Sequence, residues 1–335
     1  MTYEPEGTLY PTSENRSAIG SIQARKNAAA EGRILEARAF LCTEGHDLIV
    51  RLGRYKGIIP REEAALGIRE GTVRDSAIIS RVGHPVSFIV SRIDETGDEP
   101  LIFLSRRKAQ QRCREEYLSR LTPGDIIPAK VTRLENFGAF LDIGCGLIAL
   151  MPIDTMSVSR ISHPSERLSP GQEIYAVVSS TENGRITLSL RELLGSWAEN
   201  AALFRPGQTV SGIVRSIEEY GIFVELTPNL AGLAEKKPLH SGLSGDLPKP
   251  GTPVSVFIKS ILPDRMKVKL VIIENLTEKE PPFPLHYSQT EGRLDRWVYS
   301  PESASRRIQT VFRANAEDSV PNGPAPHEAH EEEKH

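Results

Sequence analysis

The sequence predicts an all-β protein with short linker helices, in which three small five-stranded barrels follow one another in an elongated string. Two observations carry this prediction. The chain has 335 residues, which is more than one hydrophobic core usually spans, so several separately folded units are expected. It also contains an internal repeat of short alternating segments punctuated by glycine and proline, a pattern typical of small β-barrels.

The clearest repeat lies in the centre of the chain. The segment PGDIIPAKVTRLENFGAFLDIGCGLIAL, which begins at Pro123, aligns without a gap on PGQTVSGIVRSIEEYGIFVELTPNLAGL, which begins at Pro206. Each copy opens with Pro-Gly, alternates apolar residues, turns at an aromatic-Gly pair, alternates again and later meets a second Pro-Gly. Strand-length runs bounded in this way predict one barrel over residues 122–191 and another over 205–273.

A weaker copy of the repeat precedes these two. GRILEARAFLC, HDLIVRLGRYKGIIP, HPVSFIVSRI and LIFLSRR supply strand-like runs between residues 30 and 108. The aromatic-Gly turn of the other copies is replaced by HDLIVRL, which contains no phenylalanine, tyrosine or tryptophan. We therefore expect a degenerate barrel over residues 30–108.

The stretches between the barrels have a helical period. Apolar residues recur at helical spacing in two places, which predicts amphipathic linker helices over residues 109–121 and 192–204. The residues that form these apolar stripes are Ala109, Cys113, Tyr117 and Leu121 in the first, and Leu194, Trp197, Ala198 and Ala201 in the second. We expect both stripes to dock onto the barrels.

The two ends of the chain differ from the barrels in composition. Residues 1–29 are expected to form an N-terminal arm with a short helix. Aromatic and apolar residues continue after the third barrel, so residues 274–315 are expected to be a partly ordered C-terminal extension. The last segment, 316–335, is rich in acidic residues and proline, and we expect it to be disordered.

Motifs argue against an enzyme and against a membrane protein. The three cysteines form no CxxC pair, which indicates neither a disulfide framework nor a zinc site. The chain has no GxxxxGKS/T phosphate loop and no HExxH segment, so we expect no catalytic site, no cofactor and no metal. The absence of a signal-like N-terminus and of a bilayer-length apolar stretch predicts a cytoplasmic protein.

Two aromatic residues are expected on the outer faces of the barrels. Strand alternation puts Phe140 on the outer face of the second barrel and Phe223 on that of the third, beside the polar residues Asp142 and Glu225. The alternating residues should face inward: Ala139, Leu141 and Ile143 in the second barrel, and Ile222, Val224 and Leu226 in the third. A large exposed ring on a polar face is informative, because burial would normally be preferred.

Each of these rings has a second ring nearby in the sequence. Phe137 and Tyr220 occupy equivalent turn positions three residues earlier, so each barrel would present a ring pair. Stacking of a nucleic-acid base on such a ring contributes about 1–3 kcal/mol and tolerates any base. The alternative is that the rings pack beneath a neighbouring loop or linker helix.

Cations near the rings would bind phosphates. The formal net charge is only -3, so affinity for a nucleic acid must come from local patches. The candidates are Lys130, Arg133 and Arg185 in the second barrel, and Lys259, Arg265, Lys267 and Lys269 in the third. The alternative is that these residues are ordinary solvated surface charge.

The segments NFGAFLDIGCGLIALMPID, ENGRITLSLRE and YGIFVELTPNLAGL resemble the S1 RNA-binding domain found in ribosomal protein S1 and polynucleotide phosphorylase. The resemblance covers about residues 30–273, and it is strongest in the second repeat and loosest in the first. It implies OB-fold barrels whose stacking rings are Phe137, Phe140, Tyr220 and Phe223, with Arg185 at a basic position. The family's histidine is replaced by Pro152 and Glu235.

The three-repeat arrangement resembles short S1-related proteins of Clostridia-like bacteria. This resemblance implies a monomeric translation protein that binds single-stranded mRNA and associates with the small ribosomal subunit. We expect the second and third barrels to bind RNA, and the first to bind it poorly and serve ribosome attachment. The alternative is a protein-docking adapter on the ribosome or the RNA-degradation machinery, whose partner binding would be insensitive to salt.

Overall fold

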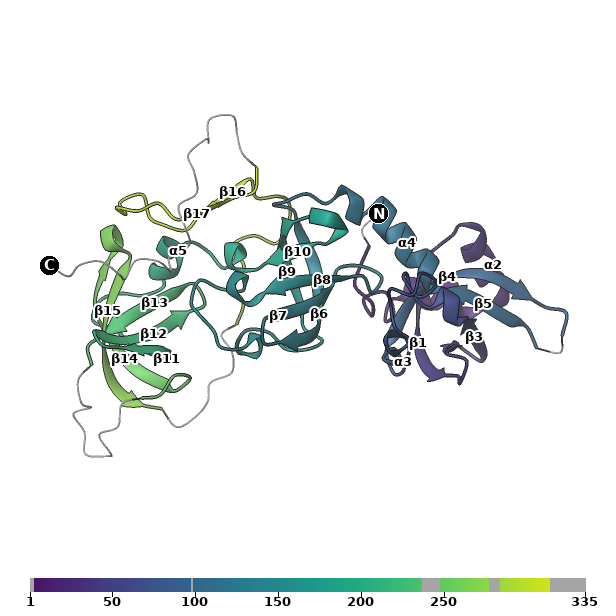
Figure 1. Cartoon of the computed structure of the whole chain (residues 1–335), viewed down its shortest axis with the longest axis horizontal. Coiled ribbons are helices and arrows are strands. Elements are labelled where there is room, and N and C mark those ends of the chain that lie inside the picture. The colour runs from purple at the N-terminus through teal and green to yellow at the C-terminus, as the bar shows by residue number, and fades with distance from the viewer. Residues whose placement is uncertain (1–2, 98, 237–247, 277–283, 314–335) are drawn as a thin grey trace.

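Three closed β-barrels lie along the long axis of the molecule (Figure 1). The computed structural model describes residues 3–97, 99–236, 248–276 and 284–313. The predicted tail over 316–335 lies outside the described residues. Five strands close each barrel, and together with few short helices they confirm the predicted fold class of tandem five-stranded barrels.

The first barrel has the strand order β1-β2-β3-β5-β4. All neighbouring strands pair antiparallel except β3 and β5, which are parallel. Its strands are β1 (Leu35–Cys42), β2 (Leu48–Leu52), β3 (Tyr55–Ile59), β4 (Pro85–Asp94) and β5 (Leu101–Ser105). The short helix α3 (Ser76–Ile79) lies between β3 and β4 in the chain.

The second and third barrels repeat this connectivity. The cyclic order is β10-β8-β7-β6-β9 in the second and β11-β12-β13-β15-β14 in the third, and the third and fifth strands of each are again parallel. The second barrel contains β6 (Ile126–Glu135), β7 (Gly138–Asp142), β8 (Ile148–Pro152), β9 (Glu173–Ser180) and β10 (Thr187–Ser189). The third contains β11 (Thr209–Glu218), β12 (Gly221–Thr227), β13 (Leu230–Ala234), β14 (Pro253–Leu262) and β15 (Lys267–Asn275).

Strand alternation gives each barrel its core. The six residues expected to face inward on β7, β12 and the loop after β7 are all buried, which confirms that part of the prediction.

Glycine is required where the second strand of these barrels begins. A Cβ at Gly138 would lie 2.3 Å from the Met151 carbonyl oxygen, and one at Gly221 would lie 2.6 Å from the Ala234 carbonyl oxygen. The aromatic-Gly turn therefore depends on glycine for close strand approach.

The helices differ from those that the sequence pattern suggested. Residues 1–29 contain α1 (Ser13–Gly20) and most of α2 (Ile22–Ala30), where one short helix was expected. The first linker holds α4 (Arg106–Glu116), capped by the Ser105 hydroxyl, which accepts a hydrogen bond from the Lys108 amide. The second linker holds only α5 (Trp197–Ala201), which begins at a capping box formed by Ser196 and Glu199.

Single 3-10 turns and one hairpin complete the described structure. The 3-10 turns are Arg61–Glu63, Leu118–Arg120, Ile153–Thr155, Pro164–Glu166, Glu182–Gly184, Arg191–Leu193 and Pro263–Arg265. The C-terminal extension forms the antiparallel hairpin of β16 (Arg296–Val298) and β17 (Gln309–Val311). Within the described ranges, no helix is long and apolar enough to cross a membrane.

Candidate nucleic-acid interface

The second and third barrels each present a ring pair of the same geometry. Phe137 and Phe140 meet edge to face with their ring centroids 6.0 Å apart and their planes at 89°. Tyr220 and Phe223 repeat this arrangement at 6.1 Å and 89°. The geometry recurs because the turn residue and the outward residue of the following strand have the same spacing in both copies.

The turn residue of each pair is open to solvent. Phe137 is 57% exposed and Tyr220 is 59% exposed, whereas Phe140 and Phe223 are half-buried. The described residues therefore leave both turn rings largely uncovered, which argues against the alternative that a loop or linker helix covers them. Exposed aromatic surface repeated at one position of two barrels is a feature of binding faces.

A row of side chains runs across the strands from Phe140. In register, Phe140 on β7 pairs with Arg133 on β6 and with Leu150 on β8. Leu150 pairs in turn with Thr187 on β10, which pairs with Ser180 on β9. The ring pair thus stands within a continuous outer row rather than alone.

The same row exists in the third barrel with different chemistry. Phe223 pairs with Ser216 on β11 and with Leu233 on β13, and Leu233 pairs with Lys269 on β15. Arg133 of the second barrel is replaced by Ser216, and Thr187 is replaced by Lys269. Each barrel therefore places one cation in its row, on opposite sides of the phenylalanine.

The cation of the second row contacts the ring directly. The Arg133 guanidinium lies 4.9 Å from the centroid of Phe140 and makes a 3.0 Å ion pair with Glu135. Its side chain remains mostly exposed. A planar guanidinium on a ring both extends the stacking surface and can contact phosphate.

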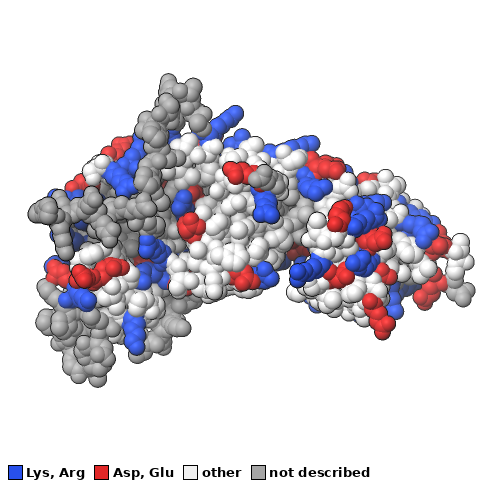
Figure 2. All heavy atoms as spheres, viewed as in Figure 1, with Lys and Arg blue, Asp and Glu red and all other residues white. Residues whose placement is uncertain are grey.

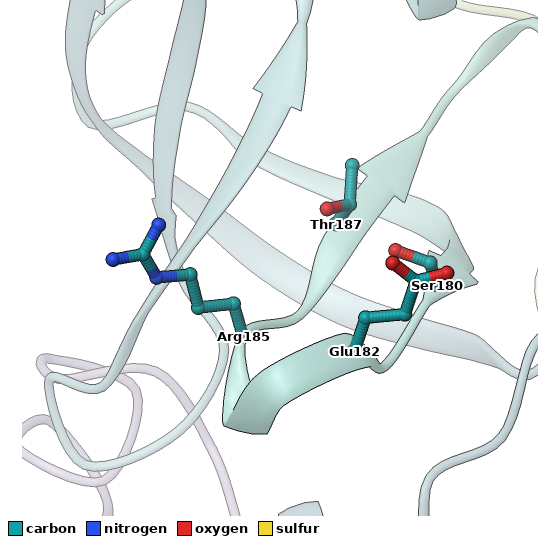
Figure 3. Close-up of a pocket in the computed structure, with 4 residues that line it drawn as sticks. All are labelled: Ser180, Glu182, Arg185 and Thr187. Atoms are coloured by element: carbon teal, nitrogen blue, oxygen red, sulfur yellow. The ribbon is translucent and has the colours of Figure 1, made fainter.

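Arg185 lies beside a polar pocket near the end of this row. The pocket is lined by Ser180, Glu182, Arg185 and Thr187, and it is formed where β9, the 3-10 turn and β10 meet. Figure 3 shows the Arg185 side chain extending away from Glu182 and Ser180. Its exposed guanidinium is thus separated from the nearby carboxylate and remains accessible to a phosphate.

Lys130 is directed to a different place. Its Nζ lies 3.3 Å from the Glu6 carbonyl oxygen and 3.9 Å from the Glu173 carboxylate. It pairs in register with Asp142, at the end of β7 away from the rings. The structure therefore brings Lys130 to the N-terminal arm and not to the ring pair.

The cations of the third barrel are distributed along β15 and its turn. Lys267 and Lys269 are exposed on alternate positions of β15. Arg265 is exposed in the preceding turn, 3.5 Å from Asp264. Lys259 lies 3.9 Å from Glu235, the residue that stands where the family has histidine. Lys269, which pairs with Leu233, is the cation that the strand register brings into the row of Phe223.

The first barrel has the row, but its turn between β1 and β2 has no phenylalanine or tyrosine and carries His46 instead. Its row contains Leu41, Ile49, Ile58, Phe103 and Arg92. The ring that is present, Phe103 on β5, has the Arg92 guanidinium 4.4 Å from its centroid. The repeat pattern did not indicate this ring, because it comes from the last strand rather than from the turn. On the face shown in Figure 2, both signs of charge are intermixed over this barrel.

The two acidic residues expected on exposed faces are buried, which corrects that expectation. Asp142 is 3% exposed and Glu225 is 0% exposed. Asp142 accepts hydrogen bonds from the amides of Glu6, Gly144 and Gly146, and burial raises its pKa above the ordinary value. Glu225 accepts a 2.7 Å hydrogen bond from the Arg167 guanidinium. Both residues lie on outer faces that neighbouring parts of the chain cover.

The described residues offer no alternative site for metal chemistry. No group of three His, Cys, Asp or Glu side chains in the described ranges could hold a metal ion. Cys113 and Cys145 are buried free thiols, and Cys42 is a half-buried one.

Closed five-stranded barrels with outward ring pairs and neighbouring cations define the class of oligonucleotide-binding barrel proteins.

Comparisons with known proteins agree with this class. The family model of the S1 RNA binding domain matches residues 120–191, which is the second barrel. Small ribosomal subunit protein bS1 of Staphylococcus aureus (strain COL) is 29% identical over 273 residues, covering 77% of this chain and 67% of that protein. These matches support the bacterial ribosomal protein S1 family, an RNA-binding family and not a known enzyme family.

Two further matches show how much of each protein is shared. The bS1 homolog of Bacillus subtilis (strain 168) is 31% identical over 202 residues, covering 57% of this chain and 52% of the homolog. A crystal structure of a multidomain protein with nucleic acid binding domains from Streptococcus pneumoniae TIGR4 is 14% identical, covers 72% of this chain and 73% of that chain, and gives a TM-score of 0.23. This chain thus spans about half to two thirds of the length of these bS1 relatives.

Proposed function

We propose that the second and third barrels bind single-stranded RNA with little sequence preference, and that the protein acts on mRNA in translation. The observation that carries the proposal is the ring pair repeated with one geometry at Phe137 and Phe140 and at Tyr220 and Phe223. Bases of single-stranded RNA are free to stack on such rings, whereas paired bases in a duplex are not.

Cations close to the rings supply the electrostatic part of the binding. Arg133 stands in the row of the second barrel with Arg185 beside its far end, and Lys269 stands in the row of the third with Lys267 nearby on β15. Each phosphate neutralised by a cation releases counterions, so the affinity should fall as salt rises. The overall charge of -3 leaves these local cations as the source of that dependence.

The relatives supply the cellular setting of the proposal. The bS1 proteins of Staphylococcus aureus are small ribosomal subunit proteins by name. We extend this role to the present chain as a monomeric, cytoplasmic mRNA-binding protein that associates with the small ribosomal subunit. The first barrel, whose turn lacks the phenylalanine or tyrosine of the other two, would serve this attachment more than RNA binding.

One structural feature argues against the adapter alternative. Peptide capture on a strand edge needs an unpaired edge strand, and the described strands of all three barrels close on themselves. A closed barrel leaves its outer faces and loops for binding, and these are where the rings stand.

Fluorescence anisotropy with labelled oligouridine and with a duplex of equal length tests the proposal. We expect the single strand to bind more tightly than the duplex, with a linear fall of log affinity against log salt. Equal binding of both forms would contradict stacking, and the absence of any binding at low salt would contradict RNA binding itself. Co-sedimentation with small ribosomal subunits tests the cellular setting separately.

A further inference from the structure

We propose that residues 284–313, called the C-terminal strap, tie the second and third barrels into one rigid body and thereby make their two ring pairs a single composite RNA site. This inference rests on the proposed function, because it concerns how two RNA-binding faces are positioned. In Figure 1 the yellow hairpin of β16 and β17 extends over both the teal and the green barrel.

The strap first returns to the second barrel. Its backbone joins the start of β6, where the Ile126 amide donates to the Gly292 carbonyl at 3.0 Å and the Leu294 amide donates to the Gly124 carbonyl at 2.9 Å. Arg293 makes a 2.7 Å ion pair with Asp125. The strap residues Leu294, Phe312 and Tyr287 pack on Ile126, Val177 and Leu193.

The strap then crosses to the third barrel. Tyr299 is buried in the core cluster of that barrel, with Trp297 and Ile308 packed beside it. The Trp197 amide donates a 2.9 Å hydrogen bond to the Tyr299 carbonyl, which ties the strap to α5 in the linker. Because one short segment belongs to the apolar clusters of both barrels, separating the barrels would expose both sets of contacts to water.

A buried ion cluster joins the barrels directly. Arg167, from the second barrel, and Arg215, from β11 of the third, both bind the Glu225 carboxylate. Arg167 and Glu225 are almost completely buried, and Arg215 also binds Glu166 of the second barrel. Opening this junction would leave the Glu225 charge without its partner from the second barrel, which disfavours open arrangements.

Asn229 connects the barrels, the linker and the strap at one point. Its Oδ1 accepts a 3.0 Å hydrogen bond from the Val158 amide of the second barrel, and its Nδ2 donates to the Arg191 and Gly195 carbonyls at 2.8 and 2.7 Å. Its own carbonyl accepts a 2.8 Å hydrogen bond from the Tyr299 hydroxyl. Asn229 is fully buried, and its bonds to the Gly195 carbonyl and to the Tyr299 hydroxyl lie away from water.

A fixed pair of barrels changes how RNA length affects affinity. A short RNA contacts one ring pair, whereas a longer RNA that reaches both gains the second contact intramolecularly, at a high effective concentration. With the barrels already ordered, no orientational freedom is lost when the second pair binds. Tyr299, Asn229 and Glu225 are therefore positioning residues, and none of them need touch RNA.

The test uses the full chain with two variants, called the junction variants, and a matched control. Tyr287→Ala combined with Phe312→Ala removes the apolar contacts of the strap with the second barrel, and Asn229→Ala removes the shared hydrogen bonds. Ser303→Ala, at an exposed position of the strap, is the control. Circular dichroism confirms that each variant retains its barrels before binding is measured.

Binding is measured with oligouridines of about 6 and about 30 nucleotides, one within and one beyond the site size of a single barrel. We expect the wild type and Ser303→Ala to bind the longer RNA far more tightly than the shorter one. In the two junction variants, the affinity for the longer RNA should fall on the order of tenfold, whereas the affinity for the shorter RNA should not change. An unchanged gain in both junction variants would overturn the proposal.

Small-angle X-ray scattering without RNA separates this proposal from the proposed function. The wild type should give the profile of a rigid pair, and the junction variants should give a broader distribution of maximum dimensions. If the variants scatter like the wild type, the strap does not hold the barrels and the proposal is overturned. If neither RNA binds the wild type, the proposed function fails and the composite site fails with it, whatever the scattering shows about rigidity.

Discussion

Asp142 and Glu225 occupy the same position of the repeat, and each is buried where its barrel meets another part of the chain. Asp142 accepts a hydrogen bond from the Glu6 amide of the N-terminal arm, and Glu225 binds Arg167 of the second barrel. In each of these two barrels, the later part of the second strand thus contacts another part of the chain. The ring pairs stand nearer the other end of the same strands, where the outer face remains open.

The contact of Glu36 on β1 with the N-terminal arm should make the free energy of unfolding depend on pH. Burial raises the pKa of Glu36 to about 7 from an ordinary value of 4.5. The unfolded chain therefore loses this proton at lower pH than the folded chain, so stability should fall as pH rises from about 4.5 to about 7 and then level off.

Glu36→Gln should remove this dependence. The glutamine can still accept from the Gly7 and Tyr10 amides and can donate to the Ser87 hydroxyl. We expect the variant to match the wild type near pH 4.5 and to exceed it by on the order of 2–3 kcal/mol near pH 8. Urea unfolding across pH measures this, and a difference that does not vary with pH would contradict the assignment.

The third barrel should lose RNA affinity when its turn ring is removed. We expect Tyr220→Ala to weaken binding of oligouridine by about 1–3 kcal/mol, because one stacking surface is lost. The salt dependence should remain unchanged, since no cation is removed. Tyr220→Phe is the matched control and should bind like the wild type. Loss of affinity in the phenylalanine variant would show that the hydroxyl, rather than the ring, makes the contact.

Removing a cation of β15 should change the salt dependence of RNA binding, unlike removing a ring. Lys267→Ala and Lys269→Ala should each lower affinity and reduce the slope of log affinity against log salt by about 0.7, the value for one phosphate on a single strand. Anisotropy titrations at several salt concentrations give this slope. A reduced affinity with an unchanged slope would show that the lysines do not contact phosphate.

Glu235 should oppose RNA binding in the third barrel. It lies 3.9 Å from Lys259, so it competes with phosphate for that cation. We expect Glu235→Gln to raise affinity by a few-fold at low salt, with the gain fading as salt screens the charges. The matched control is Glu44→Gln in the first barrel, which removes the same charge away from the ring pairs. Equal gains in both variants would indicate a general charge effect.

The strands and the ring pairs could be predicted from the sequence because both depend on local rules. Alternation of two faces determines that Leu141 points inward and Phe140 outward, and the repeated aromatic-Gly turn fixes the spacing of the rings. Gly138 and Gly221 are needed in this turn because the neighbouring backbone approaches too closely for a Cβ.

The contacts between each barrel and other parts of the chain could not be predicted from these local rules. Alternation shows that Asp142 and Glu225 leave the core, but it does not show that another part of the chain covers them. The helical period suggested a second linker helix over 192–204, whereas the capping box at Ser196 starts a helix of only five residues. The strap was expected to be partly ordered, but its contacts with two barrels depend on long-range packing that has no sequence period.

The most direct test of the RNA-binding account replaces all four rings at once. Phe137, Phe140, Tyr220 and Phe223 are changed to alanine in the full chain, folding is checked by circular dichroism, and anisotropy of labelled oligouridine is measured beside Ile79→Ala, which removes an exposed apolar side chain of the first barrel. We predict an affinity loss of at least about 100-fold in the four-ring variant and none in the control. A folded four-ring variant that binds RNA like the wild type would contradict the account.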